Sequence, residues 1–153
     1  MTLLKIIIFA LVLVIAVTFF SLYRNNANLF DAPGPVARLQ VFLTSNAAKT
    51  SDDHEFKELR TPLFDMNAEE LDRRVLGAAA DLGWEVLSHD VENQSANFVV
   101  YSPVFLFEDD VFVQVQYIDQ DRSSLYVESH SRKGRADFAA NSDHIQALIK
   151  KLR

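Results

Sequence analysis

The sequence predicts an α+β domain behind an N-terminal transmembrane helix, in the order helix, four antiparallel strands, helix. Three observations support this: an uncharged apolar run near the N-terminus, helical spacing of apolar residues at two later places, and four strand-like runs between them. Short connections imply antiparallel strands, and two amphipathic helices can cover one face of such a sheet. A chain of 153 residues is long enough for one domain with a real core.

The N-terminal run extends from Ile6 to Leu22 without a charge. At about 1.5 Å per residue it spans roughly 26 Å, close to the hydrocarbon thickness of a bilayer once the flanks are added. Lys5 can reach the headgroups and Tyr23 occupies the place of an interfacial aromatic residue. A signal peptidase needs small residues after the apolar run, but bulky residues follow it here. We therefore expect residues 1–24 to remain on the protein as an uncleaved anchor.

The charges on either side of this run slightly favour a cytoplasmic N-terminus, because Lys5 and the terminal amine oppose Arg24 and Arg38. The expected location is therefore the inner membrane, with one pass and the domain in the periplasm. Residues 1–24 hold two of the 15 basic residues and none of the 21 acidic ones, so residues 25–153 carry 13 − 21 = −8. This charge argues against nucleic acid as a partner and against broad adhesion to anionic lipid.

Composition excludes several kinds of site. The chain has no cysteine, which rules out disulfides, thiolate zinc sites and a cysteine nucleophile. Its four glycines do not form a P-loop or a dinucleotide fingerprint, so neither a nucleotide nor another cofactor is expected. The stretch Ser51–Glu55, "SDDHE", gathers potential metal ligands, but adjacent residues rarely converge on one ion. We interpret it as a solvated loop, and no metal is expected.

Residues 25–60 are expected to form a linker and a polar loop region, because Pro33-Gly34-Pro35 breaks regular structure. Within it, residues 38–43 could be a strand or one helical turn. The domain is expected over residues 61–153. Its first helix begins with Asn67 as N-cap in a capping box with Glu70, and it ends at Gly83.

The four expected strands alternate or are strongly apolar, and the chain ends in an amphipathic helix. Val111, Val113, Val115 and Tyr117 should share one face of the third strand. Asn141 or Ser142 can cap the last helix. The expected strands are Trp84–Val91, Ala96–Val104, Val111–Ile118 and Ser123–Ser129, and the apolar stripe of the last helix is Ile145, Leu148, Ile149 and Leu152.

Two stretches carry the candidate binding residues. "FEDDV" (Phe107–Val111) places acids between apolar runs, either as a turn or as a carboxylate pair that meets a basic corner. "SHSRKGRADFAAN" (Ser129–Asn141) is that corner. It is either an anion site beside a helix N-terminus or a structural turn with internal ion pairs. The candidate residues are Arg132, Arg135, Asp109, Asp110, Asp137 and Asn141.

These two stretches resemble the signature regions of domain-of-unknown-function family 1499, over Pro62 to Arg153. The matching positions are Phe107, Asp109, Asp110, Ser129, Ser131, Arg132, Gly134, Asp137, Phe138 and Asn141. Many members also carry a cysteine-containing, Pro-rich motif ahead of the first helix, which this chain lacks. The resemblance implies an exported or membrane-attached bacterial domain and no particular reaction.

Three functions are compatible with these patterns. The first is a binding or accessory module of the cell envelope, in which Arg132 and Arg135, held by Asp109 and Asp110, meet an anionic ligand or an acidic partner surface. The second is a small hydrolase that uses a carboxylate and histidine cluster. Its residues would be Asp109, Asp110, Asp137 and His130. The third is a structural interaction protein without a ligand site at the motif.

Overall fold

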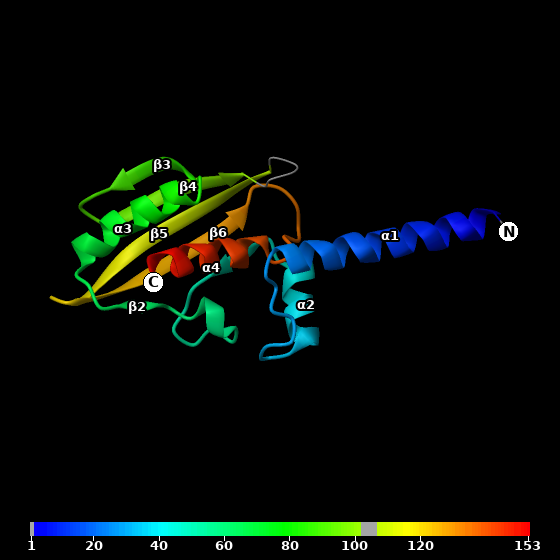
Figure 1. Ribbon diagram of the computed structural model, residues 1–153, viewed down its shortest axis with the longest axis horizontal. Helices are drawn as coiled ribbons and strands as arrows, with labels where there is room; N and C mark the ends of the chain where they lie inside the picture. The colour runs from blue at the N-terminus through cyan, green and yellow to red at the C-terminus, as the bar shows by residue number, and fades with distance from the viewer. Residues whose placement is uncertain (1, 102–106) are drawn as a thin grey trace.

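The computed structural model describes residues 2–101 and 107–153. Figure 1 shows a twisted sheet with two helices on one face and a long helix that leaves the domain. The α+β prediction is confirmed. The elements are α1 (Thr2–Arg24), α2 (Pro35–Thr44), β1 (Ala47–Lys49), the 3-10 helix η1 (Lys57–Leu59), β2 (Leu63–Phe64), α3 (Ala68–Asp81), β3 (Glu85–Asp90), β4 (Ser95–Tyr101), β5 (Glu108–Asp119), β6 (Arg122–Ser131) and α4 (Ala140–Leu152).

The sheet is antiparallel and has the order β1-β6-β5-β4-β3, with β2 also paired to β6. The expected count of four strands is therefore wrong, because the sheet has six. The two additional strands, β1 and β2, have three and two residues, which is too short to show an alternating pattern. The expected end of the second strand at Val104 lies outside the described residues. The acids of "FEDDV" do not form a turn, since Glu108 already begins β5.

The core lies between the sheet and the helices α3 and α4. Val111, Val113 and Val115 face it from β5, whereas Tyr117, expected on the same face, is 67% exposed. All four residues of the expected α4 stripe are buried. The Asn67 side chain accepts a hydrogen bond from the backbone N–H of Glu70, as the capping pattern predicts. The Glu70 side chain pairs with Arg74 instead of completing the box.

Residues 35–60 are not the expected linker and polar loop, because α2, β1 and η1 pack onto the domain. Phe42, Phe56 and Leu59 belong to the main core, and the rings of Phe42 and Phe56 meet edge to face at 5.6 Å. Ser51 also forms an isolated bridge with Arg60. The sequence does not indicate that this stretch contributes to the core, because its few buried apolar residues are separated by many polar ones.

Arg38 is fully buried on the inner side of α2 and organises this part of the fold. Its guanidinium forms a bidentate pair with Glu58, at 2.6 and 3.1 Å, and it donates to the carbonyls of Asp31, Ala32 and Ala27. Burial alone would raise the pKa of Glu58, but the hydrogen bonds from Arg38 hold it below its ordinary value. Arg38 thereby ties the connection after α1 to the 3-10 helix.

The helix α1 extends away from the domain (Figure 1), and its apolar side chains are exposed on all sides. It is long and apolar enough to cross a membrane, with a mean hydropathy of 3.0. Among the described residues, the domain is contacted by the last turn of α1: Leu22 is buried, and the Asn25 side chain that follows donates to the carbonyl of Phe138 at 2.9 Å. The base of α1 is therefore attached to the connection between β6 and α4.

Replacing Arg38 with alanine should destabilise the domain by about 3 kcal/mol, because it leaves the Glu58 carboxylate largely buried without its partner. Urea unfolding of the full chain in detergent, followed by the fluorescence of Trp84, measures this loss. The matched control is Arg74→Ala, which breaks an exposed pair with Glu70 and should cost less than about 0.5 kcal/mol. Equal losses in the two variants would contradict the role of Arg38.

Candidate functional site

The signature corner is built around the fully buried side-chain amide of Asn141. The amide nitrogen donates to the carbonyl of Asn46 at 2.8 Å, the Ser131 hydroxyl at 3.0 Å and the Asp137 carboxylate at 2.7 Å. Its oxygen accepts a hydrogen bond of 2.6 Å from the Ser129 hydroxyl. One side chain thus joins the end of β6, the start of β1 and the start of α4.

The turn before α4 has a demanding backbone. Gly134 has φ +94, and the non-glycine residues Phe138 and Ala139 have φ +51 and +70. Such values are costly for residues with a side chain, and they persist where the surroundings impose them. Asp137 holds the backbone in this conformation, because its carboxylate accepts hydrogen bonds from the backbone N–H groups of Ala139 and Asn141. The N-cap of α4 is therefore Ala139, and the expected capping by Asn141 or Ser142 is wrong.

Asp137 is largely enclosed by these contacts. Burial raises the pKa of its carboxyl above the ordinary value, although the hydrogen bonds from Asn141 and from the backbone of Ala139 oppose this shift. The backbone adds a further tie, because the N–H of Asp137 donates to the carbonyl of Ser45 at 3.1 Å. Asp137 and Asn141 therefore act together as a lock between β6, β1 and α4.

Arg132 lies on the opposite side of the sheet from α4, next to Asp110. Its Nε is 3.0 and 2.8 Å from the two carboxylate oxygens of Asp110, its Nη2 is 2.7 Å from one of them, and its Nη1 bonds to Glu108. The hydrogen bonds from Arg132 hold the pKa of Asp110 below its ordinary value, and the pKa of Arg132 is raised in turn. His130 adds a longer contact, with Nε2 at 3.6 Å from Asp110.

A family model described as "Protein of unknown function (DUF1499)" matches residues 36–152. The chain belongs to this family. The match begins at α2, earlier than the expected Pro62, which agrees with the packing of α2 and β1 onto the core. No curated protein matches the chain.

The DUF1499 signature does not join its residues as the sequence suggested. Of the expected pairing between two arginines and two aspartates, only Arg132 with Asp110 forms. Asp109 points to the helix-covered face, where its carboxylate is 2.9 Å from Nε2 of His144. Arg135 is exposed and has no hydrogen bond or ion pair with the described residues. Arg132 and Asp137 make no direct contact, so the Asp137–Asn141 lock is separate from the arginine cluster, which consists of Arg132 with Asp110 and Glu108.

The residues of the hydrolase hypothesis do not converge. Asp109 faces α4, Asp110 and His130 lie on the other face of the sheet, and Asp137 lies beneath the turn before α4. General acid–base catalysis needs such groups within hydrogen-bond reach of one substrate. Within residues 2–101 and 107–153, no group of three or more His, Asp or Glu is placed to hold a metal ion.

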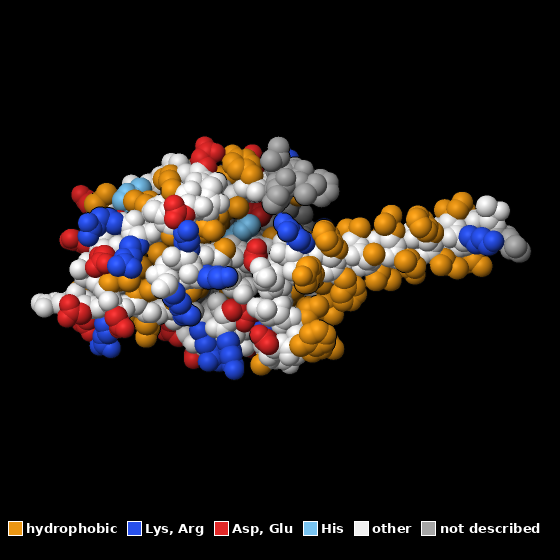
Figure 2. Space-filling view, viewed as in Figure 1, with side chains coloured by type: hydrophobic (Ala, Val, Ile, Leu, Met, Phe, Trp, Pro, Cys, Tyr) orange, Lys and Arg blue, Asp and Glu red, His pale blue; other side chains and the backbone are white. Residues whose placement is uncertain are grey.

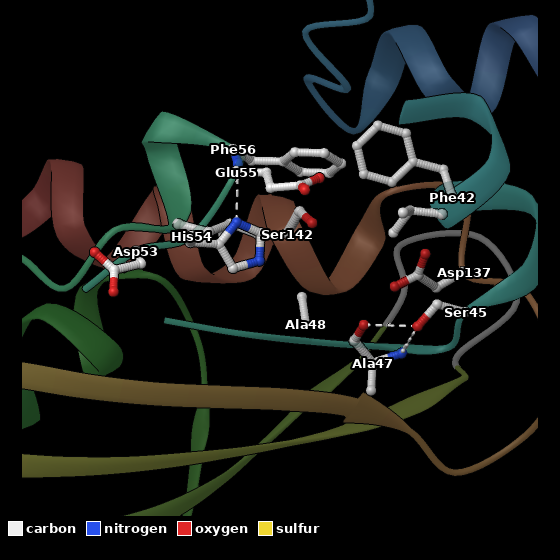
Figure 3. A pocket seen from close by; sticks show the side chains of 12 residues that line it. Phe42, Ser45, Ala47, Ala48, Asp53, His54, Glu55, Phe56, Asp137 and Ser142 are labelled. Atoms are coloured by element: carbon white, nitrogen blue, oxygen red, sulfur yellow. Dashed lines mark hydrogen bonds between the residues drawn. The ribbon is translucent and has the colours of Figure 1, made fainter. Parts of the chain in front are cut away.

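A cavity of about 360 Å³ lies next to Asp137, between α2, β1, the residues before η1 and the start of α4. Figure 3 shows Asp137 and Ser45 at one end of it and Asp53 at the other, with the rings of Phe42 and Phe56 along its wall. Its acidic groups suit a hydrogen-bond donor better than an anion. The cavity is therefore a poor match for the anionic ligand that the sequence suggested.

His54 and Glu55 also line this cavity, and no sequence pattern links them to the signature corner. His54 Nδ1 accepts a hydrogen bond of 2.9 Å from the backbone N–H of Phe56, and burial lowers the pKa of His54 below its ordinary value. The imidazole therefore favours its neutral form. His54 lies 137 − 54 = 83 residues before Asp137 in the sequence, so no local spacing pattern indicates that the two are close in space.

Replacing Asn141 with alanine should destabilise the domain by about 3 kcal/mol, because the Ser129 hydroxyl and the Asn46 carbonyl lose a buried partner. Unfolding by urea measures the loss. As a control, Asn97→Ala removes an exposed amide bonded to Ser88 and should change stability by less than about 0.5 kcal/mol. A wild-type unfolding midpoint for Asn141→Ala would refute the lock.

Proposed function

We propose that this DUF1499 protein is a membrane-anchored accessory domain of the cell envelope that presents one face of its sheet to a protein partner. The helix α1 is its single anchor, in the inner membrane, and the domain lies in the periplasm. The observation that carries the proposal is the outer face of the sheet, on the side away from α3 and α4. Among the described residues, no element packs against this face, which holds Asn97, Tyr101, Glu108, Asp110, Phe112, Gln114, Gln116, Tyr126, Glu128, His130 and Arg132.

An aromatic pair lies at the middle of the outer face. The rings of Phe112 and Tyr126 meet edge to face, with centroids 6.3 Å apart and an interplanar angle of 60°. The Tyr126 hydroxyl donates to Glu128 at 2.7 Å, and burial together with this carboxylate raises the pKa of Tyr126 to about 12. Aromatic groups ringed by polar ones are typical of the centres of protein interfaces.

Arg132 marks the end of the outer face from which the chain continues toward α4. Two carboxylates fix the orientation of its guanidinium, which lowers the entropy that a partner contact would cost. Arginine is also enriched among the residues that contribute most to interface affinity. Arg132 and Asp110 of the signature are thereby assigned to partner recognition, and Asp137 and Asn141 to the support behind it.

The charge of the outer face suits a basic partner surface. Counting the charged side chains on this side of the strands, without the Arg122–Asp119 pair at the turn, two cations stand against five carboxylates, which gives 2 − 5 = −3 with His130 neutral. Complementary charge favours encounter and selects among partners. This differs from the acidic partner suggested by the arginines alone, because both carboxylates beside Arg132 lie on the same face. The residues counted are Lys49, Arg132, Glu85, Asp90, Glu108, Asp110 and Glu128.

The orientation can be tested with single cysteines, since the chain has none of its own. In intact spheroplasts, a membrane-impermeant maleimide should label Gln116→Cys on the outer face and leave Thr2→Cys at the start of α1 unlabelled until lysis. The reverse labelling pattern would show that the domain faces the cytoplasm.

The partner surface can be tested by placing a photo-crosslinking residue at Gln116, on the outer face, or at Glu69, on α3. A discrete adduct should form in membranes from position 116 only. The adduct should weaken several-fold when Arg132→Ala is added and persist with Arg122→Ala, whose arginine sits in an exposed pair with Asp119.

Two outcomes would refute the assignment of this surface: adducts that form equally from both positions, or adducts that do not depend on Arg132. Trp84 fluorescence shows whether each variant is folded. If Arg132→Ala unfolds the domain, the arginine cluster is structural instead.

A further inference from the structure

We propose that α2, the turn before it and the cations of the β6–α4 connection lie in the headgroup region of the bilayer that α1 crosses. This inference rests on the proposed anchor and adds a second, peripheral contact to it. The membrane-facing surface consists of the apolar residues Tyr23, Phe30, Val36 and Leu43 and the cations Arg24, Lys133 and Arg135.

The first argument concerns height above the membrane. Leu22, the last residue of the uncharged run, is only 1% exposed because the domain covers it. The run from Ile6 to Leu22 spans roughly 26 Å at about 1.5 Å per residue, and the hydrocarbon core of a bilayer is about 30 Å thick. A run that is slightly short draws its flanks toward the interface. The domain therefore meets α1 at the hydrocarbon boundary, with no spacer between them.

The second argument concerns orientation. Beyond Asn25, the side chain of Asn26 donates to Asp143 at 2.7 Å and that of Asn28 to Gln146 at 3.2 Å, both on α4. Arg38 holds the carbonyls of the same connection from α2. These contacts fix the domain relative to α1 and prevent it from swinging as a tethered body would. The side of the domain that faces the bilayer is consequently always the same.

The third argument concerns the chemistry of that side. Figure 1 shows α2 running across the direction of α1 at its base, and Figure 2 shows hydrophobic side chains gathered there. Phe30 is 90% exposed and Val36 80% exposed. The only charged side chain on α2 is Arg38, which is turned inward. An apolar helix face that lies along a membrane at this height is the pattern of an interfacial helix.

Cations stand beside the apolar residues. The connection between β6 and α4 passes the base of α1, where its Phe138 carbonyl binds Asn25 (Figure 1). Lys133 and Arg135 in this connection are exposed and form no hydrogen bond or ion pair with the described residues. The anions at this height are the phosphates of the lipid headgroups. Arg135 of the signature corner therefore contacts these phosphates. The contact is local and is compatible with the net negative charge of the domain.

The full-length protein in vesicles of phosphatidylcholine and phosphatidylglycerol provides the test. An environment-sensitive fluorophore is attached to single cysteines in Phe30→Cys and Val36→Cys, with Val91→Cys as the matched control. Val91 is also apolar and 70% exposed, but it follows β3 at the end of the domain away from α1 (Figure 1). Emission wavelength and quenching by lipids with a headgroup nitroxide are measured after flotation.

The expected result is blue-shifted emission and strong quenching at positions 30 and 36, with emission at position 91 as in water. In a Lys133→Ala/Arg135→Ala background, quenching at position 36 should fall and become more sensitive to salt. If the protein floats with the vesicles while all three fluorophores report water, the peripheral contact is refuted and the anchor stands. If the protein does not float, the anchor itself is refuted, and this inference with it.

Discussion

The domain depends on satisfying one amide in its interior. Asn141 is fully buried, and its four hydrogen bonds reach three parts of the chain: two serines of β6, the residue before β1 and the turn that starts α4. A buried amide without these partners would cost more than the bonds contribute. The short strand β1 therefore stays at the edge of the sheet, and α4 begins where the backbone is otherwise unfavourable. The DUF1499 signature is in large part the set of residues that this arrangement requires.

The regular elements could be predicted from the sequence because their signals are local. Asn67 caps α3, and the apolar residues of β5 and α4 recur at the period of their element. Arg38 shows why the rest could not. A lone arginine among apolar residues indicates an exposed position, yet here it is buried by Glu58 and by carbonyls of a preceding turn. The pairing of Arg38 with Glu58, 20 residues away, is determined by the tertiary fold and has no local sequence signal. The pairing of Asp109 with His144, rather than with an arginine, has the same cause.

The signature corner separates two tasks that looked like one in the sequence. Successive residues of a strand face opposite sides, so Asp109 and Asp110 must point apart, and a carboxylate pair at one site is excluded by the pleat itself. One side of the sheet receives the buried lock, and the other receives Arg132 with its two carboxylates. The signature corner thus stabilises the end of the outer face of the sheet. The cavity beside Asp137 lies apart from that face, between α2, β1, the residues before η1 and the start of α4.

The attachment at the base of α1 also limits how the protein can meet other molecules. With α1 in a bilayer, as proposed, the domain would keep one height and one tilt and would turn freely only about the bilayer normal, because Leu22, Asn25 and Asn26 hold it against its own helix. A partner fixed in the same membrane at a matching height would need to align around a single axis. A soluble partner would have to lose every rotational freedom of its own on binding. The geometry therefore favours neighbours in the plane of the membrane, for which lateral diffusion replaces a search in three dimensions.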